Sequence, residues 1–228
     1  GSARLAGDND LAALAALNTP QGLALDSKGN LYIADTNNNV IRMVEALTRV
    51  IKTFAGTGLA GFSGDNGKAL NAKLRSPRGV AVDSADNVYI VDTGNNAIRK
   101  VSTTGVISRI AGRADGGAGY SGDGGAALSA RFNTPSALTF DATGDLYIAD
   151  TNNHVIRKIT TATGFISTIA GIGATAGNTG DGGQATSATL RSPTSVAVDG
   201  AGNIYIADSQ NHRIRRIAAS SGIITNFA

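Results

Sequence analysis

The chain has 228 residues, of which 42% are hydrophobic, so it is long enough to bury a substantial core as one folded domain spanning residues 1–228. It contains no cysteine, which excludes disulfides, thiolate metal sites and a cysteine nucleophile. A net charge of +3 without a run of basic residues gives weak support for an anionic partner, and no apolar stretch approaches the roughly 20 residues of a membrane helix.

Aspartate supplies all but one of the 17 acidic residues, since Glu45 is the only glutamate. Glutamate suits helix interiors, whereas aspartate and glycine suit caps and tight turns. With 30 glycines as well, the composition indicates short strands joined by tight corners. Gly1-Ser2 resembles a cloning remnant, so we expect any native targeting segment to be missing, and the compartment stays open.

One stretch of the chain occurs four times with the same chemistry in the same order. Its first copy reads Asn-Leu-Tyr-Ile-Ala-Asp-Thr-Asn-Asn-Asn-Val-Ile-Arg, and the copies occupy residues 30–42, 87–99, 145–157 and 203–215. The prolines before them are spaced by 57, 58 and 58 residues, at Pro20, Pro77, Pro135 and Pro193. Such a period predicts supersecondary units that stack into one object, here over residues 3–56, 57–112, 113–171 and 172–228.

The chain begins inside a connecting segment, residues 3–19, whose alanine-rich part predicts one or two helical turns. Alternating bulky and small residues then predict strands at residues 22–26, 31–34, 40–44 and 50–55. Matching strands follow in the other units, the outer ones at residues 106–111, 165–170 and 223–228. Each unit is predicted to be a four-stranded antiparallel meander.

Glycine-rich connections of about 20 residues join the units and end in a short helical turn, for which Asp65, Asp123 and Asp181 are the expected caps. A small sheet that is apolar on both faces needs a similar sheet on either side. The predicted fold is therefore all-β, a β-propeller of four four-stranded antiparallel blades with short helical turns in the inter-blade loops. The asparagine-rich turns and the long connections are expected on one face, the better surface for binding.

The repeated pattern resembles the NHL repeat. The resemblance rests on Pro-x-Gly-Val-Ala-Val-Asp, Gly-Asn-Leu-Tyr-Ile-Ala-Asp and Asn-His-x-Ile-Arg, and all four units match. Residues 121–130 resemble the long-loop variant of bacterial NHL proteins and the teneurin propeller. Histidine stands at the name-giving position only in the last two copies, as His154 and His212, where the first two have Asn39 and Asn96.

NHL propellers generally have five or six blades, whereas this chain has four repeats. The chain is then either a ring of four blades or an excised or engineered portion of a larger propeller that associates with further copies. We favour self-association, because an unclosed array leaves an apolar blade face at each end. The localisation stays open: we expect a soluble chain, and a secreted or extracellular bacterial parent is one option.

A charged pair recurs in every copy, with the aspartate and arginine seven residues apart. One interpretation is an anion or nucleic-acid site, and the other, which we favour, is a structural pair that every blade needs. The pairs are Asp35 with Arg42, Asp92 with Arg99, Asp150 with Arg157, and Asp208 with Arg215.

No residue is predicted to be catalytic, to bind a cofactor or to ligate a metal. Two histidines one blade apart are too few for a catalytic zinc site, and no serine lies in a nucleophile elbow. The Gly-Asp-Gly-Gly segments lack the lysine of a phosphate-binding loop. Candidates for contact with a ligand on the loop face are Phe62, Arg78, Arg113, Tyr120, His154 and His212.

The sequence thus favours a non-catalytic propeller that acts as a binding or assembly scaffold, with itself or another protein as partner and no membrane. Two alternatives stay open. One is an RNA or polyanion binder that uses Arg75, Arg78, Arg113, Arg131 and Arg191. The other, implied by resemblance to six-bladed propeller enzymes, is a lyase or lactonase with a metal in the central channel.

Overall fold

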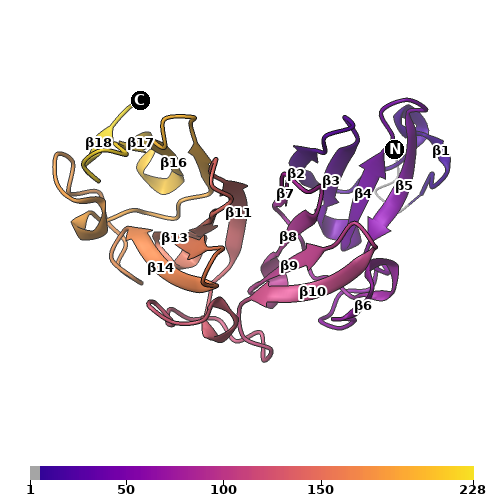
Figure 1. Cartoon of the computed structure of the whole chain (residues 1–228), viewed down its shortest axis with the longest axis horizontal. Coiled ribbons are helices and arrows are strands. Elements are labelled where there is room, and N and C mark those ends of the chain that lie inside the picture. The colour runs from indigo at the N-terminus through magenta and orange to yellow at the C-terminus, as the bar shows by residue number, and fades with distance from the viewer. Residues whose placement is uncertain (1–5) are drawn as a thin grey trace. The chain divides into compact units, whose positions relative to one another are not determined.

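The computed structural model describes residues 6–228, so Gly1-Ser2 and the first residues assigned to the first blade, 3–5, lie outside the described residues (Figure 1). Contacts divide the chain into two compact units, residues 1–110 and 111–228. Each unit holds two antiparallel sheets. No helix within residues 6–228 is long and apolar enough to cross a membrane.

In the first unit, each sheet has a core of four strands in sequence order. The strands of the first blade are β2 (Pro20–Leu25), β3 (Leu31–Asp35), β4 (Val40–Val44) and β5 (Val50–Ala55). Those of the second blade are β7 (Val80–Val82), β8 (Val88–Asp92), β9 (Ala97–Val101) and β10 (Val106–Ala111), the last reaching the boundary between the units. Two-residue strands from the connections extend the outer edges: β1 (Asp10–Leu11) pairs with β5, and β6 (Gly67–Lys68) with β10.

The second unit repeats the same meander without named strands at its outer edges. The third blade contains β11 (Pro135–Phe140), β12 (Leu146–Asp150), β13 (Val155–Thr160) and β14 (Phe165–Ala170). The fourth contains β15 (Ser195–Val198), β16 (Ile204–Asp208), β17 (Arg213–Ile217) and β18 (Ile224–Asn226). The last strand is shorter than the predicted residues 223–228.

The helical turns are single turns of 3-10 helix. Those in the connections are η1 (Ala12–Leu14), η3 (Ala69–Asn71), η5 (Ala127–Ser129) and η7 (Ala185–Ser187). Those between the second and third strands of each blade are η2 (Thr36–Asn38), η4 (Thr93–Asn95), η6 (Thr151–Asn153) and η8 (Ser209–Asn211). The prediction of an all-β propeller of four blades with short inter-blade turns is confirmed. The single domain over residues 1–228 stays a prediction.

A left-handed residue ends each turn between the second and third strands. These residues are Asn39, Asn96, His154 and His212, with φ between 50° and 59°. Asparagine and histidine tolerate this conformation better than most side chains, whereas β-branched residues do not. The backbone of the turn therefore explains why asparagine or histidine occupies this position in every copy.

Within each unit, one blade face packs against the opposite face of the next blade. In the first unit, Tyr32 and Ile41 of the first blade share a buried cluster with Val80, Ile90 and Val101 of the second. In the second unit, Ile156 of the third blade shares one with Val196 and Ile206 of the fourth. Burying each large aliphatic side chain contributes about 1.5–3 kcal/mol, so the sheets depend on their neighbours.

Candidate functional site

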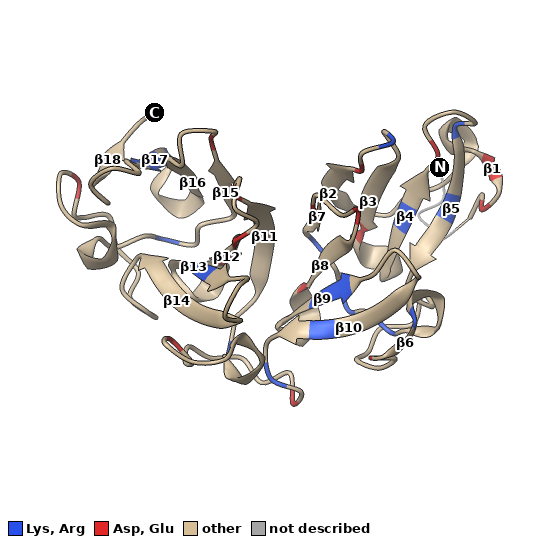
Figure 2. Cartoon of the chain, viewed as in Figure 1, with Lys and Arg blue, Asp and Glu red and all other residues tan. Residues whose placement is uncertain are grey.

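A fully buried arginine lies in the middle of the third strand of each blade; the basic positions are visible within β4, β9 and β13 (Figure 2). It meets the aspartate that ends the second strand, because the two strands are joined by a single turn. The guanidinium to carboxylate distances are 3.8 Å for Arg42 and Asp35, 3.4 Å for Arg99 and Asp92, and 3.5 Å for both Arg157 with Asp150 and Arg215 with Asp208.

A second aspartate, from the glycine-rich connection, binds each arginine more closely. The pairs are Asp8 with Arg42 at 2.5 Å, Asp65 with Arg99 at 2.8 Å, Asp123 with Arg157 at 2.7 Å and Asp181 with Arg215 at 2.9 Å. The prediction that Asp65, Asp123 and Asp181 cap helical turns is wrong. The N-cap positions are Lys68, Ala126 and Gln184, without side-chain capping bonds, because the carboxylates turn toward the buried cations instead.

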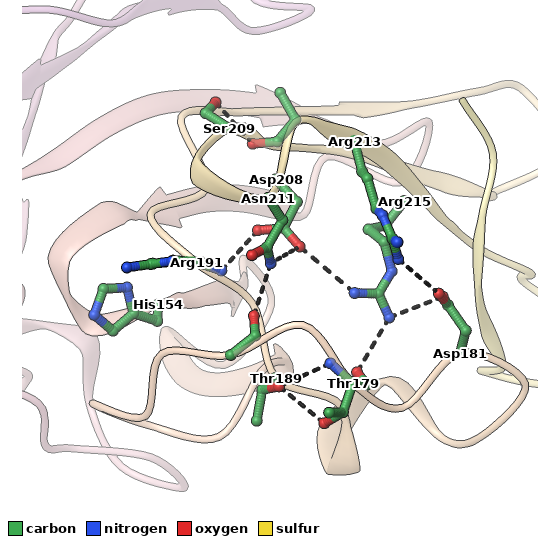
Figure 3. A network of polar contacts seen from close by, with 12 residues as sticks. His154, Thr179, Asp181, Thr189, Arg191, Asp208, Ser209, Asn211, Arg213 and Arg215 are labelled. Atoms are coloured by element: carbon green, nitrogen blue, oxygen red, sulfur yellow. Dashed lines mark hydrogen bonds and ion pairs between the residues drawn. The ribbon is translucent and has the colours of Figure 1, made fainter.

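Hydrogen-bond donors surround the inner aspartate on both oxygens, as Figure 3 shows for the fourth blade. Asp208 Oδ1 accepts the Arg191 amide at 2.7 Å, and its Oδ2 accepts the Asn211 side-chain amide at 2.8 Å besides Arg215. Asn211 also donates to the Gly177 carbonyl at 2.7 Å. The cluster therefore fastens the turn, the connection and the start of the first strand to one another.

The backbone amide and the asparagine side-chain amide recur as donors in the other blades, but burial opposes the charge. Burial raises the pKa of Asp92 to about 6 and that of Asp150 to about 7, because loss of hydration outweighs the neighbouring amides and guanidinium. Nε of all four arginines is buried without a hydrogen-bond partner within residues 6–228. The buried contacts fix the position of each arginine side chain. Its unbonded Nε is buried, so it is not available to a ligand in solvent.

Two of the ligand-face candidates lie over these arginines. The Phe62 ring is 4.9 Å from the Arg99 guanidinium carbon, and the Tyr120 ring is 5.0 Å from that of Arg157. Tyr120 also donates its hydroxyl hydrogen to Asp123 at 2.8 Å. Cation–π contact thus occupies one face of both rings.

The remaining arginine candidates differ from each other. Arg113 pairs with Asp115 at 3.2 Å, whereas Arg78 has no ion-pair partner in the described part of the chain. A ligand role for all six candidates stays a prediction.

His154 connects the third blade to the fourth. Its Nδ1 accepts the Ser192 amide hydrogen at 3.0 Å, as Asn39 Oδ1 accepts that of Ser76 at 2.9 Å in the first unit. Burial, with the nearby Arg191 guanidinium, lowers the pKa of His154 from its usual value; the two side chains lie beside each other in Figure 3. His212, the equivalent residue of the fourth blade, is exposed.

Replacing His154 with asparagine is expected to make stability less dependent on pH. A lowered folded-state pKa means that His154 contributes fully above the unfolded pKa of about 6.5, and that this contribution is lost as the pH falls. Protonation also removes the Nδ1 acceptor, whereas the amide of asparagine keeps one. Urea unfolding at pH 7 and pH 5 should show a larger loss for the wild type than for H154N. Equal losses would contradict this role.

Sequence reasoning missed two members of each cluster. One is the asparagine that bonds the inner aspartate, at Asn38, Asn95, Asn153 and Asn211. The other is the outer aspartate of the connection. Both recur at the interval of the arginines, so the shared spacing was the available signal. Within residues 6–228 there is no group of three or more histidine, cysteine, aspartate and glutamate side chains that could hold a metal ion.

Comparisons with known proteins find similarity over most of this chain. The chloroplast protein SUPPRESSOR OF QUENCHING 1 of Arabidopsis thaliana is 31% identical over 89% of this chain, which spans 20% of that protein. Mouse teneurin-1 is 31% identical over 97% of this chain, which spans 9% of it. The structure of virginiamycin B lyase from Staphylococcus aureus shares the fold, with a TM-score of 0.59 and 16% identity over 93% of this chain and 58% of the lyase.

Family models match along the sequence and include the buried arginines. The NHL repeat model matches residues 17–42, 132–159 and 190–217, and the teneurin NHL domain model matches residues 58–119. The chain therefore belongs to the NHL-repeat family of β-propellers.

Proposed function

We propose that this chain is a non-catalytic binding and assembly module whose first ligand is a further copy of itself. The observation that carries the proposal is an apolar blade face in the first unit. Leu23 and Leu25 on β2 are 62% and 63% exposed, whereas Val80, at the position of Leu23 in the second blade, is 5% exposed. Large apolar side chains in such a row favour association over contact with water.

The fourth blade presents the opposite kind of face. Ile214 and Phe227 are 36% and 59% exposed, whereas Ile156, at the position of Ile214 in the third blade, is fully buried. Phe227 packs edge-on against Tyr205 at 5.1 Å, as Phe54 does against Tyr32 at 4.8 Å in the first blade. The same aromatic pair is thus covered by a neighbouring blade in one unit and open in the other.

The mass of the protein in solution tests this function. Light scattering at increasing concentration should show a rise from 23.0 kDa to whole multiples of it. High salt should strengthen or preserve the association, because the faces are apolar. A mass of 23.0 kDa at every concentration would contradict the proposal.

Polyanion binding is a second candidate, favoured by arginines that lack carboxylate partners. Arg75, Arg78 and Arg191 make no ion pair within residues 6–228, unlike Arg113 and Arg131, which both contact Asp115. Binding of single-stranded RNA should weaken steeply with salt and should fall in the R75A and R191A variants. Absence of binding at low salt would eliminate this candidate. Similarity to the lyase concerns the fold alone and supplies no argument for catalysis.

A further inference from the structure

Both blade interfaces within the units use the same pair of polar contacts. In the first unit, Thr36 Oγ1 donates to the Pro77 carbonyl at 2.8 Å while Asn39 accepts the Ser76 amide. In the second unit, Thr151 Oγ1 donates to the Pro193 carbonyl at 2.9 Å while His154 accepts the Ser192 amide. Each turn therefore forms two hydrogen bonds with the Ser-Pro dipeptide that precedes the first strand of the next blade.

The fourth blade carries the equivalent groups, and its own unit supplies no further Ser-Pro dipeptide to bind them. Ser209 stands where Thr36 and Thr151 stand, and His212 where Asn39 and His154 stand. They border a hollow of about 390 Å³, here called the socket, lined by Ala207, Ser209, His212, Arg213, Ile214 and Ala228. The His154 ring accepts the Ser192 amide hydrogen, whereas the His212 ring makes no hydrogen bond or ion pair with the residues that the structure describes.

The complementary element is the segment that leads into the first blade, Leu17–Pro20, here called the lead-in. Thr19 has φ of 55°, close to the 46° of Ser76 and 48° of Ser192, so its amide is turned the same way. Within residues 6–228 this amide has no hydrogen-bond acceptor. Pro20 is exposed, whereas Pro77 and Pro193 are buried.

We infer that the socket of one copy binds the lead-in of a second copy, which joins copies head to tail. Ser209 Oγ, which contacts Thr194 Oγ1 and the Ala207 carbonyl in its own blade, turns its hydroxyl hydrogen to the partner's Pro20 carbonyl, and His212 Nδ1 accepts the partner's Thr19 amide hydrogen. The partner's Leu23 then packs against the face of Ile214. This inference rests on the proposed self-association and specifies its interface.

A second copy is the occupant because the chain contains both halves of an interface that it already forms within each unit. The two polar contacts fix register, and the apolar face around them supplies the driving force. A head-to-tail contact uses a different surface on each copy, so it generates rings or open arrays rather than a single symmetric pair. An isologous dimer would need one face to match itself.

Complementation between two variants tests the head-to-tail arrangement. Leu23→Asp removes an exposed apolar side chain of β2 next to the lead-in, and Ile214→Asp removes an apolar side chain of the socket; both positions are exposed, so the internal interfaces stay intact. Each variant alone should remain at 23.0 kDa by light scattering, and an equimolar mixture should form a 1:1 complex of twice that mass. Circular dichroism verifies that each variant is folded.

The possible failures are distinguishable. If the wild type associates and the mixture stays monomeric, or if either variant associates alone, the inferred interface is wrong while self-association stands. A wild type that is monomeric at every concentration would overturn the proposed function as well.

A milder pair of variants isolates the polar contacts. His212→Ala should weaken wild-type association about fivefold to tenfold, the effect of one lost hydrogen bond. The neighbouring Gln210→Ala, an exposed side chain outside the socket, should leave the dissociation constant unchanged. Equal affinities of H212A and Q210A would overturn the assigned role of His212.

Discussion

Replacing Arg157 with methionine is expected to lower the free energy of unfolding by about 3–5 kcal/mol, because two carboxylates would lose the buried cation between them. Arg157 binds Asp123 at 2.7 Å and Asp150 at 3.5 Å, and it donates to the Ser121 carbonyl at 3.1 Å. Methionine fills similar space, so the loss reports the charge and its hydrogen bonds rather than a cavity. Urea unfolding followed by circular dichroism measures it.

Arg191→Met is the matched control. Arg191 lies in the same unit, its side chain is exposed, and it makes no ion pair with another described residue. Surface substitutions of this kind change stability by no more than about 0.5 kcal/mol. If R157M and R191M proved equally stable, the buried clusters would not fasten the blades in the way described.

Replacing Gly122 with alanine is expected to cost about 2–4 kcal/mol, by combining left-handed strain with a collision. Gly122 has φ of +98°, and an added Cβ would lie 2.6 Å from the Cα of Ala130 and 2.9 Å from its Cβ. Ala130 is fully buried at the end of η5, so its backbone cannot shift away from the added methyl group. The connection would separate from the strand that carries Arg157.

Gly124→Ala separates the two effects. Gly124 has φ of +77° but nothing within 4 Å of an added Cβ, so only the backbone strain of about 1–2 kcal/mol applies. Thermal unfolding of both variants under one set of conditions should place G122A well below G124A. Equal melting temperatures would show that the close approach to Ala130 relaxes without cost.

The repeat was sufficient to predict the blades, because the same runs of strand-forming residues recur four times between turn residues, and the second strands of the first three blades are buried on both faces. Strands 40–44 and 50–55 were predicted with the bounds that the structure has. The pairing of Asp123 with Arg157 was not predictable from local rules, since 34 residues separate them and an aspartate before a short turn suits capping equally well. Only the fold brings the connection over the third strand.

The contacts of the two loop aromatic residues were likewise not predictable from the sequence. Phe62 and Tyr120 sit in glycine-rich loops, where sequence alone favours exposure to a ligand. In the structure each ring covers a buried guanidinium, and Tyr120 lies so close to Gly173 that no larger residue would fit there. These two loop positions therefore contribute to packing.

Hydroxyl-radical footprinting of two equivalent phenylalanines tests the central claim most directly, because Phe54 is covered by the second blade and Phe227 lies on the open face of the fourth. At low protein concentration, Phe227 should be oxidised much faster than Phe54. At high concentration, Phe227 should become protected while Phe54 changes little. A constant rate at Phe227 across all concentrations would contradict the account that copies of this chain cover the open blade face.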